Sequence, residues 1–269
     1  MNDKIKGKIP VISARDKMFY NCFFVALFIL FVLATYLAQF NPFEALLKSE
    51  TFFRFLREDF FPPVVKRPDI VLSAIAVTVG LAFIASFLAM IFAFFTAVFV
   101  CTRVSPIPKL AKFIRAIVTL IRNIPTLMWA FILFSALGTG TGVAVIALMI
   151  SSFGFLTRAF VEVMDELPPG SLEFVSGCGG TFGQKVFHNV VPNCLPGCIE
   201  WVLYNVDVNI RASTAVGMVG GGGIGGVLFM YIKGFDYQMA AAIILIIALL
   251  VIIVEFIMTR IKKSLSLST

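Results

Sequence analysis

The sequence predicts an all-α polytopic membrane protein that crosses the bilayer as six transmembrane helices. Of its 269 residues, 59% are apolar and only 14% are charged, against about 25% charged residues in an ordinary soluble domain. Apolar runs of about 20 residues recur along the chain, which is the length that a helix needs to cross the hydrocarbon core. The sequence lacks the alternating strands of about ten residues that mark an outer-membrane barrel. These observations exclude a water-soluble domain.

The first expected elements are a cytoplasmic tail, residues 1–17, and a transmembrane helix over residues 18–40. Basic residues outnumber acidic ones in the tail, so the positive-inside rule places the N-terminus in the cytoplasm. The apolar run is too long for the core of a signal peptide, and we therefore expect an uncleaved span.

Residues 41–70 should then form an external loop that contains an interfacial helix. Asn41, Pro42 and Glu44 are typical of an N-cap, a first-turn proline and a capping acid. Bulky apolar residues share one face of this helix before two prolines stop it. These residues are Phe52, Phe53, Leu56 and Phe60, followed by Pro62 and Pro63.

Residues 71–260 are expected to form the core of the transmembrane domain. The second span, residues 71–102, carries no charge and is longer than the bilayer core, so it must tilt, bend near Gly80 or protrude. The next segment carries only basic charges, and its apolar residues recur at i, i+3 and i+4 up to Arg122. This pattern predicts a cationic amphipathic helix at the inner leaflet.

The remaining crossings follow from three further apolar stretches. Residues 123–157 should form two short spans joined by a glycine-containing external turn, residues 195–219 a fifth span and residues 237–258 a sixth. The basic tail, residues 261–269, then lies in the cytoplasm. The count of crossings and the charge bias agree on an N-in and C-in topology.

The sequence indicates no enzyme, cofactor or metal site. It has one histidine, His188, and lacks the Gly-x4-Gly-Lys-Ser/Thr loop that cradles phosphates, so we expect no ATP hydrolysis by this chain. Gly220, Gly222 and Gly225 satisfy the GxGxxG pattern, but the strand and the acidic residue of a dinucleotide site are missing. The net charge of +7 is concentrated in particular loops, where it reports topology rather than nucleic-acid binding.

The fifth span carries a polar stripe. Glu200, Tyr204, Asp207 and Arg211 stand at i, i+4, i+7 and i+11 of a helix that is otherwise suited to lipid. Charges inside a span usually face a pathway or a partner helix. Two interpretations stay open: Asp207 and Arg211 neutralise each other and pack the bundle, or Arg211 contacts an anion in transit while Asp207 orients it.

A glycine-rich run, residues 217–226, follows the fifth span. Glycine permits close approach of backbones and unusual conformations. Unpaired backbone at membrane depth is tolerated only where it lines a cavity or is buried in protein. The run is therefore either an external hinge or a gate whose peptide N–H groups contact an anion.

The segment between the fourth and fifth spans identifies a family. Glu173, Gly179 and Pro192 resemble the E-A-A-x3-G loop of binding-protein-dependent ABC importer permeases, with the glycine six residues after the glutamate and the proline thirteen after the glycine. Phe174 and Val175 replace the two alanines of that loop. The resemblance implies the type I ABC importer permease fold, with a cytoplasmic coupling loop at about residues 165–196 that seats on a separate ATPase.

A second stretch narrows the resemblance. Tyr204 to Gly225 is similar to the fifth-span signature of phosphonate-type importer permeases, with Asp207 in place of glutamate and Gly221 in place of alanine, and Arg122 to Trp129 is similar to their R-x-I-P-E-L-x-W segment. By this resemblance the chain carries phosphonate, phosphite, phosphate or a related phosphorus oxyanion. The residues expected to form the pathway are Asp207, Asn209, Arg211, Ser213, Thr214, Gly220, Gly222, Gly223 and Gly225.

The resemblance also implies the partners. They are cytoplasmic ABC ATPases that bind the ATP, an external or periplasmic substrate-binding protein, and a second permease chain, which we expect to be an identical copy, all at the inner membrane with its lipid. An alternative from another class is a proton-coupled secondary transporter or channel for a small anion that uses Glu200, Asp207 and Arg211. A scaffold without transport would leave the Glu173 loop and the polar stripe unexplained.

Overall fold

The computed structural model describes most of the chain as helices. The described residues are 14–102, 105, 107–168, 170, 175 and 177–266, and they contain no strand. The chain divides into two compact units, Met1–Glu58 and Asp59–Thr269. The all-α class predicted from the sequence is confirmed.

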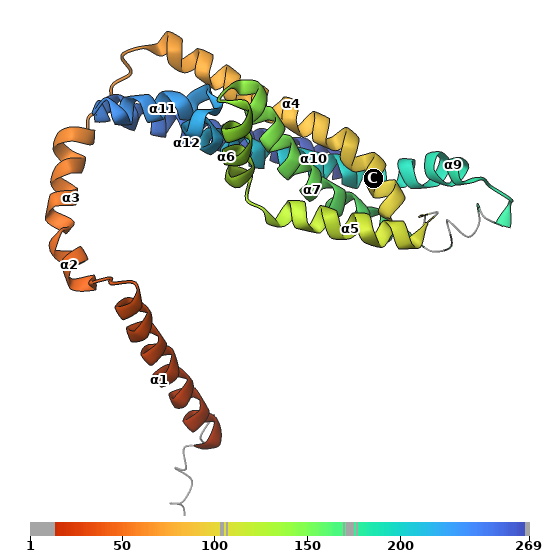
Figure 1. Cartoon of the computed structure of the whole chain (residues 1–269), viewed down its shortest axis with the longest axis horizontal. Helices are drawn as coiled ribbons and strands as arrows, with labels where there is room; N and C mark the ends of the chain where they lie inside the picture. The colour runs from red at the N-terminus through yellow and green to blue at the C-terminus, as the bar shows by residue number, and fades with distance from the viewer. Residues whose placement is uncertain are drawn as a thin grey trace, which may run out of the picture. The chain divides into compact units, whose positions relative to one another are not determined.

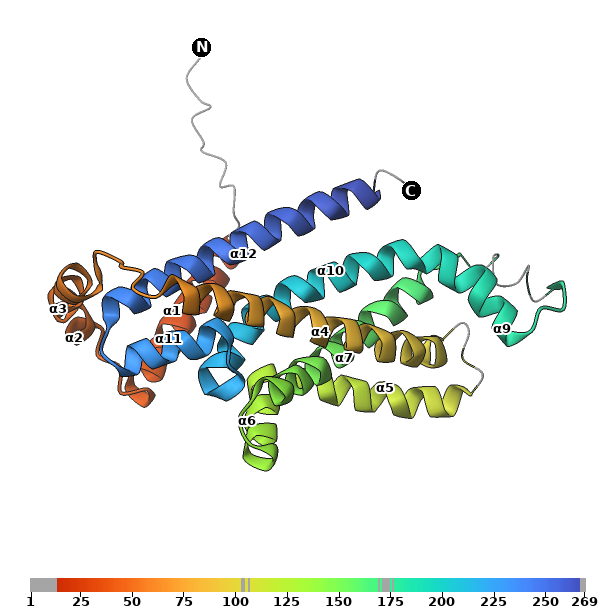
Figure 2. The same ribbon diagram turned by 90° about the horizontal axis from the view of Figure 1, so that it is seen from above.

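Three long helices form the centre of the larger unit. They are α4 (Pro68–Val100), α7 (Thr141–Asp165) and α10 (Val191–Val216). They lie side by side in both views of the molecule (Figures 1 and 2), and each contacts the other two extensively. Against them pack α5 (Pro108–Asn123), α6 (Thr126–Leu137), α11 (Gly223–Lys233) and α12 (Tyr237–Ser266).

Small side chains allow this close packing. Ala85, Ala89, Ala93 and Ala97 stand four residues apart on α4, and none of them is exposed. Residues at this spacing lie on one face of a helix, and small residues there let neighbouring backbones approach closely. The helix continues through Gly80 without a break.

The structure of residues 123–157 differs from the pair of short spans that the sequence predicted there. The first member, α6, has only 12 residues, about 18 Å of helix, which is shorter than the hydrocarbon core of about 30 Å. It is separated from α5 by Pro125 and bent from it by 89°. The described part of the chain thus contains four helices long and apolar enough to cross a membrane, or up to six if each of two bent helix pairs counts as one span.

The fifth predicted span begins earlier than the sequence indicated. The sequence placed a cytoplasmic loop up to about residue 196, whereas a continuous helical stretch runs from Phe182 to Gly221 and includes the short α9 (Phe182–Lys185). Pro192 lacks an N–H for the carbonyl four residues earlier, and the π-helical turn η2 (Val186–Val190) directly before α10 accommodates this loss. A further helix that the sequence analysis did not predict, α11, follows the glycine run.

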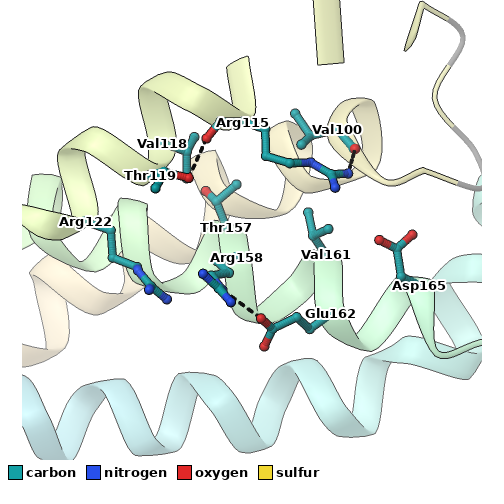
Figure 3. A pocket seen from close by; sticks show the side chains of 10 residues that line it. All are labelled: Val100, Arg115, Val118, Thr119, Arg122, Thr157, Arg158, Val161, Glu162 and Asp165. Atoms are coloured by element: carbon teal, nitrogen blue, oxygen red, sulfur yellow. Dashed lines mark hydrogen bonds and ion pairs between the residues drawn. The ribbon is translucent and has the colours of Figure 1, made fainter. Parts of the chain in front are cut away.

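At one end of the bundle, α4, α5 and α7 are fastened together by side-chain hydrogen bonds (Figure 3). Arg115 of α5 donates from Nη2 to the carbonyl oxygen of Val100 at 2.6 Å, which satisfies an end carbonyl of α4. Asp165 at the end of α7 accepts from the backbone N–H of Thr102 at 3.0 Å. The same end of α4 meets α9, where the rings of Phe99 and Phe182 stack with centroids 6.2 Å apart.

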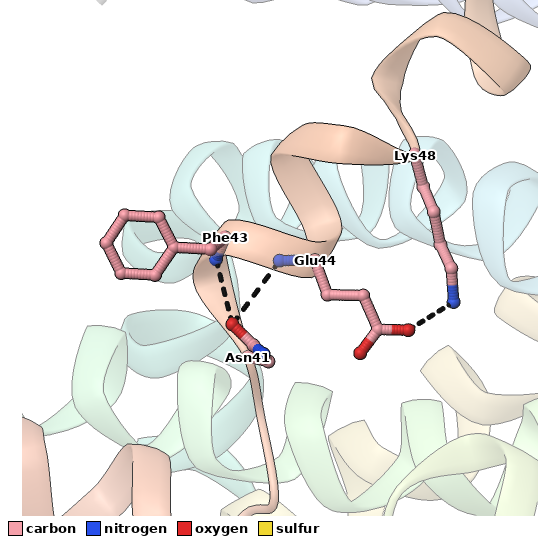
Figure 4. Close-up of polar contacts among 4 residues, drawn as sticks. All are labelled: Asn41, Phe43, Glu44 and Lys48. Carbon is pink, nitrogen blue, oxygen red and sulfur yellow. Dashed lines mark hydrogen bonds and ion pairs between the residues drawn. The ribbon is translucent and has the colours of Figure 1, made fainter.

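The smaller unit holds α1 (Ala14–Leu37), α2 (Pro42–Leu47) and α3 (Ser49–Phe55), the last continuing into the π-helix η1 (Leu56–Phe60). The predicted cap of the interfacial segment is confirmed: Asn41 Oδ1 accepts from the N–H groups of Phe43 at 3.1 Å and Glu44 at 3.3 Å (Figure 4). Glu44 in turn pairs with Lys48 at 2.7 Å. The helical stretch ends before Pro62, as predicted.

Candidate functional site

The predicted coupling segment is described only in part. Glu173 lies outside the described residues. Gly179 has a φ of +77°, a conformation that suits glycine, and Gly180 donates its N–H to the carbonyl of Val175 at 3.0 Å. Thr181 then begins α9 with a reciprocal capping box to Gln184. A glycine bend at Gly179 thus leads directly into a capped helix.

The helical part of this segment presents an exposed face. Phe187 of η2 is 69% exposed and Phe182 is 38% exposed, whereas Val186 and Val190 of the same turn are buried in the core with α4 and α7. Exposed aromatic residues on a well-anchored helix are typical of a contact surface for another protein. Pro192, the third residue of the predicted motif, lies in the first turn of α10.

A cluster of uncharged polar side chains joins α4, α7 and α10 inside the bundle. Asn209 donates from Nδ2 to Ser86 Oγ and to Ser152 Oγ, both at 2.8 Å, and Asn205 donates to Ser86 Oγ at 3.0 Å. All four residues are buried. We call Ser86, Ser152, Asn205 and Asn209 the polar seam. Its hydrogen bonds satisfy side chains that would otherwise be costly to bury.

The charged pair of α10 lies at the edge of the bundle instead. Arg211 Nη2 donates to Asp207 Oδ2, so the i, i+4 pairing expected from the sequence forms. The Asp207 side chain is 11% exposed and the Arg211 side chain 48% exposed. The second carboxylate oxygen, Asp207 Oδ1, is buried and has no hydrogen-bond partner among the described residues. Glu200, two turns earlier in the predicted stripe, is exposed.

The glycine run bends the chain by 55° between α10 and α11. The turn η3 (Gly217–Gly221) follows α10, and three glycines in or directly after it have positive φ: Gly220 at 122°, Gly222 at 78° and Gly223 at 66°. These conformations are strained for residues with a Cβ atom. The run is therefore a defined bend rather than a simple extension of the span.

The bend is fixed against α4 by one threonine. Thr78 Oγ1 accepts from the N–H of Ile224 at 2.8 Å and donates to the carbonyl of Ala74 at 2.9 Å. A Cβ atom added at Gly223 would lie 2.4 Å from Thr78 Oγ1, and one added at Gly225 would lie 1.8 Å from the carbonyl oxygen of Thr214. Close backbone approach thus requires glycine at both positions.

An open hollow borders this bend. It has a volume of about 650 Å³ and is lined by glycine backbone together with Phe131, Met218 and Phe229. Among the described residues no charged side chain lines it, so the polar groups that border it are those of the peptide backbone. Whether the run acts as a hinge or as a gate stays a prediction.

The structure separates the predicted pathway residues into three environments. Asn209 belongs to the polar seam, and Ser213 and Thr214 donate hydrogen bonds to the carbonyl of Ile210. Asp207 and Arg211 form the edge pair, and Gly220 and Gly222 border the hollow. Their role in a pathway stays a prediction. Thr78 and the serines of the polar seam were not predicted from the sequence. An uncharged polar residue inside an apolar run is the signal that could have indicated them.

Comparison with known proteins gives a consistent family. Residues 89–267 match the family described as binding-protein-dependent transport system inner membrane component. The phosphate-import permease protein of Mycolicibacterium smegmatis is 33% identical over 183 residues, which cover 68% of this chain and 34% of that protein. The phosphite transport system permease protein of Stutzerimonas stutzeri is 30% identical over 66% of this chain and 65% of its own length. The chain therefore spans about a third of the first relative and less than two thirds of the second.

Other matches agree with these. A putative cryptic phosphonate transport system permease protein of Escherichia coli is 33% identical over 44% of this chain and 97% of its own length. Among solved structures, an inward-facing MetNI methionine ABC transporter matches with a TM-score of 0.66 at 22% identity, over 73% of this chain and 96% of that one. A bacterial ABC transporter that imports alginate matches with a TM-score of 0.63 at 11% identity, over 93% and 98% of the two chains. At these identities the structural matches establish the fold.

Proposed function

This chain belongs to the family of inner membrane components of binding-protein-dependent transport systems, and we propose that it forms the transmembrane path of an ATP-driven importer for phosphonate, phosphite, phosphate or a related phosphorus oxyanion. The family resemblance predicted from the sequence is confirmed, as is the location in the inner membrane. The observation that carries the substrate class is that relatives 30 to 33% identical are named for phosphate, phosphite and phosphonate transport.

The proposal includes the topology and the partners. The N-in and C-in arrangement with six crossings counts the bent pairs α5–α6 and α10–α11 as one span each. ATP is bound and hydrolysed by separate ABC ATPases, so this chain is a transporter subunit and not an enzyme, and it needs no cofactor of its own. An external substrate-binding protein delivers the anion, and a second copy of the chain completes the permease.

The coupling step is assigned to the segment from Glu173 to Pro192. Its capped helix α9 and the exposed Phe187 form the surface for the ATPase. Because one helix runs from Phe182 to the glycine bend, movement of the ATPase is passed directly to the bend. The anion path is assigned to Arg211, with Asp207 as its orienting partner, and to the glycine bend, where peptide N–H groups contact the anion.

A detergent pull-down from native membranes tests the assembly. Co-purification of an ABC ATPase with this chain, together with a substrate-binding protein that binds phosphonate or phosphate, is the expected result. Repeated recovery of the intact chain alone, with uptake that collapses with the proton gradient, would overturn the importer and favour a carrier that uses Asp207 as its proton site.

The coupling segment is tested by adding one methyl group. Gly179→Ala forces a residue with a Cβ atom into a positive-φ position, at a cost of about 1 kcal/mol. We expect substrate-stimulated ATPase activity of the purified complex to fall severalfold. Gly142→Ala at the start of α7 is the matched control, because a Cβ atom there meets nothing within 4 Å. Equal stimulation in both variants would remove Gly179 from the coupling step.

A further inference from the structure

A pocket at the end of the bundle away from the glycine bend is lined by three arginines that the proposed pathway does not use. It lies between α5 and α7 beside the end of α4, and it has a volume of about 290 Å³ (Figure 3). Arg115 and Arg122 of α5 and Arg158 of α7 line it. The pocket is at the end of α4 that packs against α9, whereas Arg211 stands further along α10, toward the glycine bend.

The three arginines have more donors than the protein accepts from them. Arg115 gives one nitrogen, Nη2, to the carbonyl of Val100, and its buried Nε has no hydrogen-bond partner among the described residues. Arg158 gives Nε to Glu162 Oε1 at 2.7 Å. The described residues provide no ion pair for Arg122. Each guanidinium has five donors in a planar fork, so most of them remain available.

A buried hydroxyl points to the same conclusion independently. Thr157 lines the pocket and is only 1% exposed, yet its Oγ1 has no hydrogen-bond partner among the described residues. Figure 3 shows this side chain between the arginine of α7 and the face of α5. A buried hydroxyl without a partner is costly, and most such groups in proteins are satisfied by a ligand or water. The pocket therefore lacks an acceptor that both Thr157 and Arg115 could use.

The acidic residues of the pocket do not supply that acceptor. Asp165 Oδ1 already accepts from Thr102 N at 3.0 Å and from Cys101 Sγ at 3.2 Å. Glu162 is engaged by Arg158 within its own helix and is half exposed. Asp165 is thus held by residues directly after α4, and Glu162 by Arg158 of α7. Three arginines line the pocket against these two carboxylates.

The approach of α5 to α7 that forms this pocket depends on one glycine. A Cβ atom added at Gly154 of α7 would lie 3.0 Å from the backbone nitrogen of Arg122 and 3.1 Å from its Cα. Gly154 is buried, so the end of α5 rests directly on the backbone of α7. Arg122 is held at the pocket by this close contact rather than by an ion pair.

We propose that this pocket binds a tetrahedral oxyanion of the phosphate class, held by Arg115, Arg122 and Arg158 with a hydrogen bond from Thr157. Phosphate oxygens accept several charge-assisted hydrogen bonds at once and match the planar fork of arginine. Two sources present this chemistry: free phosphate, and the headgroup of an anionic lipid such as phosphatidylglycerol. The inference concerns a site separate from Arg211 and does not depend on the transported substrate.

Binding of radiolabelled inorganic phosphate to the purified full chain in lipid-free detergent tests the first source. Arg122→Gln removes charged donors and should weaken binding about tenfold, and Thr157→Val removes the hydroxyl at nearly constant volume and should weaken it about fivefold. Lys112→Gln is the matched control, because it removes one positive charge from the same helix without lining the pocket. It should leave binding unchanged.

Native mass spectrometry of the same variants from phosphatidylglycerol and phosphatidylcholine nanodiscs tests the second source. Retention of phosphatidylglycerol by the unmodified chain and by Lys112→Gln, with loss in Arg122→Gln and Thr157→Val, would assign the pocket to a headgroup. Loss of phosphate binding in the same two variants would assign it to the free anion. Either pattern supports the shared site.

Three results would overturn the inference. The first is that neither ligand binds the unmodified chain. The second is that Arg122→Gln and Thr157→Val bind both ligands as well as the unmodified chain does. Phosphate binding that is abolished by Arg211→Gln but kept in Arg122→Gln would place the anion in the proposed pathway alone. Arg122→Gln and Thr157→Val must show the normal thermal unfolding midpoint in detergent, and the conservative Arg122→Lys should recover part of the affinity.

Discussion

Two polar pairs interleave along α10 and lie in opposite environments. Asn205 and Asn209 are 2% and 3% exposed, and their amides bond to serines of α4 and α7. Asp207 and Arg211, on the next face, pair with each other, and Arg211 is half exposed. The amides of the neutral pair hold α4, α7 and α10 together. In the charged pair, guanidinium donors of Arg211 remain available, and Asp207 Oδ1 has no hydrogen-bond partner among the described residues.

The difference follows from the cost of burial. An amide can be buried at little net cost once its hydrogen bonds are made. Burying an ion pair costs several kcal/mol of desolvation for each charge, which the pair recovers only with excellent geometry and further hydrogen bonds. Charge at the edge of the bundle therefore stays available for contact with something outside this chain, whereas the neutral polar groups hold the fold. Four experiments test this contrast.

We expect Asn209→Leu to have the largest effect, which is a loss of stability. The change removes the amide that bonds to Ser86 and Ser152 and leaves two buried hydroxyls with fewer partners, at a cost of about 2 kcal/mol. The thermal unfolding midpoint in detergent should fall clearly, and the loss should be non-additive with Ser152→Ala because the two share a bond. Asn21→Leu on the exposed face of α1 is the control. An unchanged midpoint would mean that the polar seam does not hold the bundle.

We expect the second-largest effect when the charged pair of Asp207 and Arg211 is neutralised, and this effect is on transport. Arg211→Ala alone would leave Asp207 buried and unpaired, so the informative variant is Asp207→Asn with Arg211→Gln. Uptake of radiolabelled phosphonate or phosphate should fall at least about tenfold, which is about 1.4 kcal/mol of binding, while the unfolding midpoint is retained. Neutralising the exposed pair of Glu44 in α2 and Lys48 directly after it in the same way is the control. Normal uptake in the double variant would show that the pair serves only packing.

The third effect concerns the bend that follows both pairs. Thr78→Val removes the acceptor for the N–H of Ile224 and should cost about 1 kcal/mol. Hydrogen exchange of the Ile224 amide should become faster, while exchange at the start of α10 stays unchanged. Thr78→Ser, which keeps the hydroxyl, should restore protection. Equal protection in Thr78→Val would show that close packing of glycine alone fixes the bend.

The smallest effect is expected from an ion pair outside the membrane spans, which serves as the reference for the charged pair of α10. Lys66 Nζ lies 2.6 Å from Asp236 Oδ2, and this hydrogen bond lowers the pKa of the Asp236 carboxyl below its usual value. A lowered pKa in the folded state means that the pair stabilises the fold above the unfolded pKa of about 3.9 and loses this contribution as the pH falls further.

Because both side chains of this reference pair are partly exposed, its contribution should be below about 1 kcal/mol. Lys66→Gln should therefore lower the unfolding midpoint slightly at pH 7, and the difference from the unmodified protein should shrink as the pH falls below about 3.9 and vanish only below the lowered pKa of Asp236. A difference that persists at low pH would assign the effect of Lys66→Gln to packing rather than charge.

Local signals in the sequence predicted much of the fold. The cap at Asn41, the amphipathic pattern of α5 and the long apolar run of α12 each depend on residues within one or two turns, and each is found in the structure. The glycine run after the fifth span was recognised as a hinge or gate, whereas the break at Pro125 between α5 and α6 was not predicted. Whether a short apolar helix such as α6 crosses the membrane depends on packing and direction that no local pattern contains.

In the candidate site, a contact within one helix could be predicted from the sequence, whereas contacts between distant helices could not. The pairing of Asp207 with Arg211 was expected from their spacing of four residues on one helix. The contact of Thr78 with Ile224 joins residues 146 positions apart, and that of Asn209 with Ser86 joins residues 123 positions apart. A single hydroxyl in an apolar run does not indicate its distant partner, so these contacts emerge only when the helices are packed.

The length of α10 (Val191–Val216) sets a mechanical scale for the molecule. Its 26 residues at 1.5 Å each make a helix roughly 39 Å long. Pivoting this helix by about 8° carries its far end through roughly 5 Å, a displacement comparable to the diameter of a phosphate ion. A small tilt imposed at one end of α10 thus reaches the other end as a movement of the size of such an ion.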